Sequence, residues 1–384
     1  MRLRTLPYLV AVLSAGLAGA VRPARLPAQP APAPAEQLQA ALVAEVSANP
    51  SLPGELLHVH APRVGLDTTL AAGVGDRASG QALAAPHLFR IASVTKTFTA
   101  AAILRLVEQG RLGLDDPIRR HLSAEYDTLL RADGYRTDAI TVRHLLTHTS
   151  GLHDYASDER YYAAVLAAPT RRWTRLEQVR AAMEWGAPLF APGADFRYSD
   201  TGYILLGEIL ERASGLRSAE AYRTLLDFRR LGLDATYLET LEPAPAGAAA
   251  LAHPYVGDVD AVGFDPSMDL YGGGGLVSSA RDLARFYRAL LRGEVFRDAA
   301  TLRTMLTVPA TNDRPGGPYA MGIQRLTLGA QVCWGHHGFW GTAAKYCPDA
   351  DVAVVRHISQ AQPAAPFVVR ALDDQVARVL DLHR

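Results

Sequence analysis

"RIASVTKTFTAAAILRL", residues 90–106, places Lys96 three positions after Ser93, in a segment whose pattern predicts a helix ending near Gly110. Side chains three positions apart lie on the same face of a helix, so the amine can reach the hydroxyl. Of the 39 lysines and arginines in the chain, only Lys96 and Lys345 are lysines. A buried ammonium can lose its proton and act as a base, whereas a guanidinium stays charged. The stretch therefore predicts a nucleophilic serine with a functional lysine beside it.

The same two residues also allow a simpler interpretation. Ser93 can be an ordinary helix N-cap, followed by a solvated lysine. A four-residue pattern of this kind also arises by chance. The pair therefore needs further catalytic groups elsewhere in the sequence to support it.

Length and composition limit the class of protein. The chain has 384 residues, 49% of them hydrophobic, and a formal net charge of zero. Such a chain can bury one large core or two coupled cores. Without a charge excess it lacks the long-range field that holds a polyanion or an anionic membrane surface. We therefore expect no nucleic-acid partner.

The N-terminal segment MRLRTLPYLVAVLSAGLAGAVRP combines basic residues, an apolar stretch over residues 6–17 and small residues at 18–20. This pattern is typical of a secretory signal peptide over residues 1–20, and a Pro/Ala-rich tether follows over residues 21–36. The apolar stretch is shorter than the about 20 residues that span a bilayer, and an uncleaved anchor is the alternative. We expect a periplasmic or extracellular protein with no stable membrane span after cleavage.

Cys333 and Cys347 are the two cysteines of the chain, and they flank WGHHGFWGTAAKY. An exported protein meets an oxidising compartment, where disulfides persist. If this segment is a hairpin centred on Trp340, the two cysteines lie directly opposite, within reach of a disulfide. The pattern leaves open a disulfide or two buried free thiols.

The order of elements indicates the architecture. A helix and strands come first, and mainly helical signals then continue to about residue 250. Strand signals return with YAMGIQRLTL, QVCWGHHG, TAAKYC and DVAVVRHI, before a final amphipathic helix. This order predicts a discontinuous α/β domain, residues 37–115 and 270–384, interrupted by a helical domain over residues 116–269. A cleft between the two is the natural place for a site.

FRYSDTGYILLG places Tyr198 and Asp200 in a short turn before an amphipathic helix. Acyl transfer by a serine needs a base for the hydroxyl proton and a proton donor for the leaving group. A tyrosine beside an ammonium can approach the phenolate form, because an opposite charge favours ionisation. Tyr198 is thus a candidate proton shuttle. The alternative is an aromatic side chain that simply packs at a helix start.

WGHHGFWGT carries glycine at every third position, at Gly335, Gly338 and Gly341. Glycines inside a strand pattern indicate close approach by another backbone or by a ligand. An edge here can present the Phe339 amide to an oxyanion, with the Ser93 amide as the second donor. His336 and His337 point to opposite faces of a strand, so only one of them can line a pocket. A purely structural histidine is the alternative.

Together these segments resemble serine hydrolases of the class C β-lactamase and D-alanyl-D-alanine carboxypeptidase family, which also includes esterases and D-amino-acid amidases. The likeness lies in FRIASVTKTFTAAAILRLVEQGRLGLDDPI, ITVRHLLTHTSGL, FRYSDTGYILLGEILERASG, YGGGGLVSSARDLARF and WGHHGFWGT. It implies an α/β (α+β) fold of the β-lactamase/transpeptidase-like type. In that fold an antiparallel sheet is flanked by the N- and C-terminal helices, and an all-helical domain is inserted.

The resemblance also implies roles for these residues. SVTK, residues 93–96, is similar to the first family motif, a nucleophile with its lysine. YSD, residues 198–200, is similar to the second, whose tyrosine acts as base and proton relay, and HHG, residues 336–338, lies at the place of the third. The implied activity is acyl-enzyme hydrolysis of an amide, β-lactam or ester in a small molecule or peptide, such as a cell-wall peptide. No cofactor and no metal are implied.

Two positions depart from the family pattern. The second motif often ends in asparagine, whereas an ionised Asp200 can only accept hydrogen bonds. As a counter-ion it favours the charged form of Lys96, which leaves Tyr198 as the preferred base. His337 replaces a small hydroxyl residue in the third motif, which weakens recognition of a substrate carboxylate. Both departures favour an ester or peptide hydrolase over an antibiotic-destroying enzyme.

Other functions have weaker support. A Ser-His-Asp hydrolase predicts a Gly-x-Ser-x-Gly elbow, which the sequence lacks. A zinc enzyme could use His58 and His60, or His336 and His337, as ligands. However, His58 and His60 lie in strand-like sequence, and no HExxH zinc motif occurs. YGGGGL lacks the Gly-Lys-Ser/Thr of a phosphate loop. The alternative from another class is a non-catalytic protein on the same scaffold that binds cell-wall peptides or penicillin.

Overall fold

The computed structural model describes residues 32–313, 317–361 and 366–383. The predicted signal peptide and most of the predicted tether lie outside these residues. Residues Pro34–Arg384 form one unit by their contacts, and the elements below belong to it. Among the described helices, none has the length and apolar character needed to cross a bilayer.

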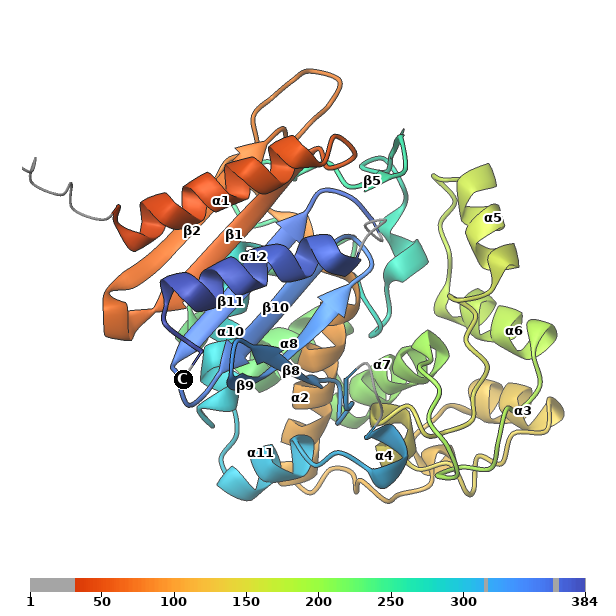
Figure 1. The fold of residues 1–384 in the computed structure, drawn as a ribbon. Coiled ribbons are helices and arrows are strands. Elements are labelled where there is room, and N and C mark those ends of the chain that lie inside the picture. The colour runs from red at the N-terminus through yellow and green to blue at the C-terminus, as the bar shows by residue number, and fades with distance from the viewer. Residues whose placement is uncertain (1–31, 314–316, 362–365, 384) are drawn as a thin grey trace, which may run out of the picture. The chain divides into compact units, whose positions relative to one another are not determined.

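Six antiparallel strands form the main sheet, in the order β2-β1-β11-β10-β9-β8 (Figure 1). The strands are β1 Gly54–Ala61, β2 Leu66–Gly73, β8 Gln324–Leu328, β9 Gln331–Gly338, β10 Thr342–Cys347 and β11 Val352–Ile358. Strand β1 pairs with β2 on one side and with β11 on the other, so it joins the N-terminal hairpin to the C-terminal strands. The antiparallel sheet implied by the family resemblance is confirmed.

The first and last helices, α1 (Pro34–Ala48) and α12 (Pro366–Val379), cover one face of this sheet (Figure 1). Leu38 and Leu42 of α1 form a buried cluster with Leu57 and Val59 of β1, and with Val376 of α12. Alternate residues of a strand point to one face, which is why Leu57 and Val59 share it. The flanking helices are confirmed, with one difference. Helix α1 begins at Pro34, inside the predicted tether, because proline is well tolerated in the first turn of a helix.

The opposite face packs against α10 (Ala280–Leu291), and α2 (Thr95–Glu108) packs in turn against α10. Every residue of α2 from Thr95 to Leu106 is buried, as expected of a helix enclosed by protein on all sides. Phe98 of α2 stacks on Phe286 of α10 with ring centroids 3.6 Å apart. The segment RIASVTKTFTAAAILRL, residues 90–106, therefore contains most of the central helix of this unit.

The remaining elements complete the helical part and two small sheets. The helices are α3 Ala124–Ala132, α4 Val142–Leu146, α5 Glu159–Ala167, α6 Arg175–Trp185, α7 Asp200–Ser214, α8 Ser218–Leu226, α9 Phe228–Leu231 and α11 Ala299–Met305. The short strands are β3 Phe89–Arg90, β4 Tyr237–Leu238, β5 Tyr255–Val256, β6 Val259–Asp260 and β7 Leu276–Ser278. The region between β2 and β8 is thus mainly helical, and its division into two domains stays a prediction.

The hairpin of β9 and β10 decides between the two alternatives for the cysteines. Thr342 pairs with Gly338 and Tyr346 with Trp334, so the register places Cys347 opposite Cys333. The two cysteines form a disulfide, with their Cα atoms 4.0 Å apart. The predicted hairpin centred on Trp340 is therefore confirmed, and this bond closes its open end.

Candidate active site

Ser93 lies in a single 3-10 turn, Ala92–Val94, that leads directly into α2. The residue before it, Ala92, has φ +44°, a left-handed backbone that is uncommon outside glycine. Gly338 of β9 faces this turn so closely that a Cβ there would lie 2.2 Å from the Ile91 carbonyl oxygen. The close approach predicted from the glycine pattern is confirmed at this position. It holds the Ser93 turn against the end of β9.

Lys96 is fully buried, and its ammonium lies at the centre of the site. The Nζ atom is 2.9 Å from Ser93 Oγ and 2.9 Å from the Gly273 carbonyl oxygen. It also forms an ion pair with Asp200, the first residue of α7. Burial alone would lower the pKa of Lys96, but Asp200, with help from Tyr198, raises it above its ordinary value. Lys96 is therefore protonated, as expected when an aspartate replaces the family's usual asparagine at position 200.

Tyr198 completes the predicted trio just before α7. The Lys96 ammonium lies 5.0 Å from the centroid of its ring, and the phenol interacts electrostatically with Lys96. Burial raises the pKa of Tyr198 above its ordinary value, although the Lys96 charge acts in the opposite direction. The sequence favoured a phenol close to ionisation. Here the phenol is neutral at rest, because desolvation outweighs the attraction of the ammonium.

His148, which sequence reasoning missed, fixes the position of the tyrosine. Its ring lies 4.2 Å from the Tyr198 ring, centroid to centroid, and Nδ1 accepts a hydrogen bond of 3.1 Å from the Ser199 amide. Burial, followed by the nearby Lys96 charge, lowers the pKa of His148 well below its ordinary value. A neutral ring therefore packs beside Tyr198. The sequence signal for His148 is the family-like segment ITVRHLLTHTSGL, residues 140–152, which lies outside the three motifs that imply catalytic roles.

The two histidines of β9 separate as strand alternation predicts. His336 is buried, with Nε2 3.0 Å from the Tyr319 hydroxyl and its ring 6.3 Å from the Tyr198 ring. Burial lowers the pKa of His336 to about 3, so it is neutral. His337 is exposed, and its Nδ1 lies 3.0 Å from Gln324 Oε1. The structure does not bring His337 into the site, because the pleat turns it to the other face.

A cavity of about 280 Å³ opens beside these groups and is lined by Ser93, Tyr198, Asp200 and Phe339. Within the described residues, neither the Ser93 amide nor the Phe339 amide has a hydrogen-bond acceptor. Two free amides at one cavity can receive a developing oxyanion. Aromatic side chains form much of the remaining wall: Tyr155, Tyr161 and Tyr162.

Two further carboxylates line the same cavity and were not foreseen. Asp154 Oδ1 accepts hydrogen bonds from the amides of Asp200, at 2.9 Å, and Ala156, at 3.2 Å. Asp269 lies beside the Gly-rich turn, where a Cβ on Gly274 would touch its carboxylate. Burial, and then the Asp200 charge, raises the pKa of both Asp154 and Asp269 to about 7. With Asp200 they make three acidic groups around one cavity.

The lining otherwise carries little charge. Among the described residues that line this cavity, none is an arginine or a lysine. The Lys96 ammonium, which contacts Ser93, is already paired with Asp200. The cavity therefore has an excess of carboxyl groups, which disfavours an anionic ligand.

Comparison with known proteins agrees with this geometry. The Beta-lactamase family profile matches residues 63–378. The chain is 30% identical over 246 residues to a penicillin-binding protein of Bacillus subtilis, covering 59% of this chain and 50% of that protein. It is 39% identical over 162 residues to esterase EstB of Burkholderia gladioli, covering 41% of this chain and 40% of EstB. The matches thus span half or less of these two relatives.

The fold also matches solved structures over most of the chain. A D-stereospecific amidohydrolase from Streptomyces sp. superposes with a TM-score of 0.74 at 28% identity, covering 88% of this chain and 98% of that protein. The family profile spans the segments that carry Ser93, Lys96 and Tyr198. The chain belongs to the beta-lactamase family, the penicillin-binding-protein-like class of serine hydrolases.

Proposed function

We propose that the chain is a secreted serine hydrolase, periplasmic or extracellular, that works through an acyl-enzyme on Ser93. The observation that carries this proposal is the buried Lys96 ammonium 2.9 Å from Ser93 Oγ, with the Tyr198 ring 5.0 Å from that ammonium. A serine is a weak nucleophile unless a base and a positive field act on it. The family membership and the esterase and amidohydrolase among the similar proteins support the same chemistry.

Acylation follows from these contacts. Tyr198 first loses its own proton to solvent; Ser93 Oγ then bonds to the substrate carbonyl carbon while its proton passes to the Tyr198 phenolate. The same proton then moves from Tyr198 to the leaving nitrogen or oxygen as its bond to carbon breaks. Water next attacks the acyl ester and gives one proton to Tyr198. The ester bond then breaks, that proton passes from Tyr198 to Ser93 Oγ, and the acid is released. Tyr198 acts as base and as acid in turn.

Lys96 acts through its charge in this scheme. Its ion pair with Asp200 keeps it protonated, so it does not take the serine proton itself. Instead its ammonium favours both the Tyr198 phenolate and the attacking oxygen. The Ser93 and Phe339 amides receive the oxyanion on the carbonyl side.

The acidic cavity defines the preferred substrate. Asp154, Asp200 and Asp269 face the space where a substrate lies, and His336 beside it is neutral. Above about pH 7, where Asp154 and Asp269 are ionised, a carboxylate, as carried by penicillins or a C-terminal peptide, is repelled there, whereas an ammonium gains an ion pair. The proposed substrates are therefore esters and amides with a free amino group, and the aromatic wall suits an aromatic side chain.

Replacing the nucleophile tests the acyl-enzyme directly. Intact mass spectrometry after treatment with a fluorophosphonate should show one adduct on the wild type and none on Ser93→Ala, because only an activated serine reacts. Thermal unfolding should show that the variant keeps its fold. A wild type that stays unlabelled would support the alternative of a non-catalytic binding protein, and labelling that persists in Ser93→Ala would exclude Ser93.

Lys96→Arg should reduce kcat/KM at least about 100-fold, because a planar guanidinium cannot replace a compact, fully buried ammonium between Ser93 and Asp200. The chain offers a matched control in Lys345, its other lysine, which pairs with Asp373. Lys345→Arg should keep near wild-type activity. An active Lys96→Arg variant would contradict the role given to the ammonium.

Removing one cavity carboxylate tests the charge preference. The wild type should cleave the p-nitroanilide of D-phenylalanine in preference to its N-acetylated form, and Asp269→Asn should reduce that preference about tenfold, about 1.4 kcal/mol. Asp234→Asn, at an exposed aspartate outside the cavity, is the control for net charge and should change nothing. Equal cleavage of both anilides by the wild type would refute the substrate class while leaving the acyl-enzyme untouched.

A further inference from the structure

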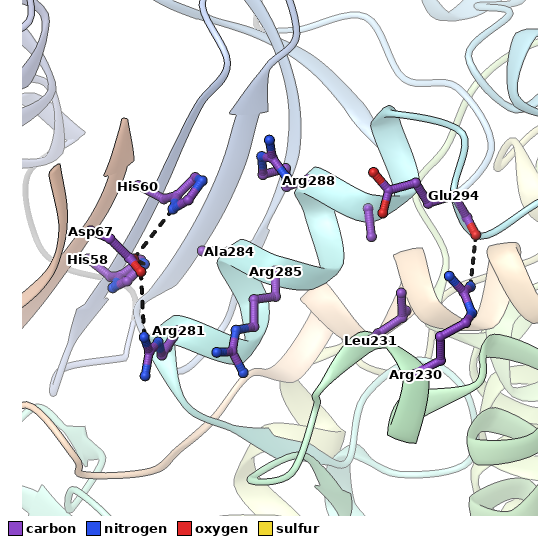
Figure 2. A pocket seen from close by; sticks show the side chains of 11 residues that line it. His58, His60, Asp67, Arg230, Leu231, Arg281, Ala284, Arg285, Arg288 and Glu294 are labelled. Carbon is purple, nitrogen blue, oxygen red and sulfur yellow. Dashed lines mark hydrogen bonds and ion pairs between the residues drawn. The ribbon is translucent and has the colours of Figure 1, made fainter. Parts of the chain in front are cut away.

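A second cavity, of about 300 Å³, lies between α10, α9 and the hairpin of β1 and β2 (Figure 2). Its lining has no residue in common with the cavity beside Ser93. Four arginines line it, three from α10 and one from α9: Arg281, Arg285, Arg288 and Arg230. The hydrolase site does not explain why four guanidinium groups gather at this cavity.

Helix α10 places three of these arginines on one face. Arg281, Arg285 and Arg288 follow each other at spacings of four and three, so they stack along the helix. The other face, with Leu283 and Phe286, is buried in the core. Like charges at such spacings repel each other and weaken a helix, unless counter-charges balance them.

The flanking arginines have such counter-charges. Arg288 donates two hydrogen bonds to Asp351, of 2.8 and 3.0 Å, and Arg281 lies 3.5 Å from Asp67. Arg285, between them, has a different environment. One of its nitrogens donates to the Gly232 carbonyl at 2.9 Å, and within the described residues no carboxylate lies within ion-pair distance of it.

Strand β1 supplies the opposite wall. His58 and His60 alternate with the residues that pack on α1, so both side chains face α10 (Figure 2). His58 is held by Thr69 at 2.8 Å, and burial lowers its pKa to about 4, so it is neutral. The Nε2 atom of His60 is buried and, within the described residues, has no hydrogen-bond partner. An unpaired buried polar atom beside a cavity is a place for a ligand or a water.

The charges along the lining do not balance. Arg230, Arg281 and Arg288 each have a carboxylate partner, whereas Arg285 has none among the described residues, so one guanidinium of the lining is unbalanced. Arginine binds phosphate and carboxylate oxygens through paired hydrogen bonds in a fixed geometry. We propose that this cavity binds a small multivalent oxyanion, with Arg285 as its main ligand and Arg281 and Arg230 beside it.

Such a ligand would bind the folded protein and leave Ser93 accessible. It would bridge α10, α9 and the β1–β2 hairpin, and would raise the thermal midpoint by mass action. Phosphates and polycarboxylates share the chemistry that Arg285 recognises, so both are used as probes.

Isothermal titration of the full chain with inorganic pyrophosphate, and separately with citrate, tests the proposal. We expect one molecule to bind per chain at low ionic strength, and Arg285→Gln should weaken that binding at least about tenfold. Arg303→Gln is the matched control, because Arg303 is exposed on α11 and does not line the cavity. Ser93→Ala should bind as the wild type does. Thermal unfolding without ligand checks that each variant is folded.

Tighter binding of pyrophosphate identifies phosphate as the recognised group, and tighter binding of citrate identifies polycarboxylate; either result supports the site. Absence of saturable binding to the wild type would overturn the proposal. It would also be overturned if Arg303→Gln lost as much affinity as Arg285→Gln, since the effect would then be one of net charge alone.

Discussion

The buried ammonium of Lys96 is the constraint on which the site depends. A fully buried charge is tolerated only when it is paired and hydrogen-bonded. Lys96 meets this condition by joining three distant segments: the Ser93 turn, Asp200 at the start of α7, and the Gly273 carbonyl. The interactions that compensate for the desolvation of Lys96 therefore also hold the segments of the site together. Loss of the Asp200 carboxylate would leave the buried charge of Lys96 unbalanced, which is strongly destabilising.

The aspartate at the end of the second motif changes the proton chemistry. Asp200 holds Lys96 in its charged form, so the lysine acts as an electrostatic partner and the proton must move through Tyr198. Burial and, after it, the same carboxylate raise the pKa values of Asp154 and Asp269, which share its cavity. One residue thus links the choice of base to the proposed preference for cationic substrates.

Local geometry was predictable from the sequence, and long-range contact was not. Helical spacing predicted that Lys96 reaches Ser93, strand alternation separated His336 from His337, and hairpin register placed the two cysteines opposite each other. Asp154, Asp269 and His148 reach the site from loops far along the chain, so no periodicity indicates them. The neutral state of Tyr198 was also missed, because it depends on how deeply neighbouring segments bury it. The arginine cavity likewise forms only where α10 meets β1.

The pH dependence of acylation tests the central claim most directly. Single-turnover acylation by a neutral ester, followed from about pH 6 to about pH 10, reports the protonation of the base. If Tyr198, with its raised pKa, is that base, the rate should rise about tenfold per pH unit across most of this range. A rate that reaches its plateau near neutral pH would contradict the account, since a base already free at pH 7 cannot be this phenol.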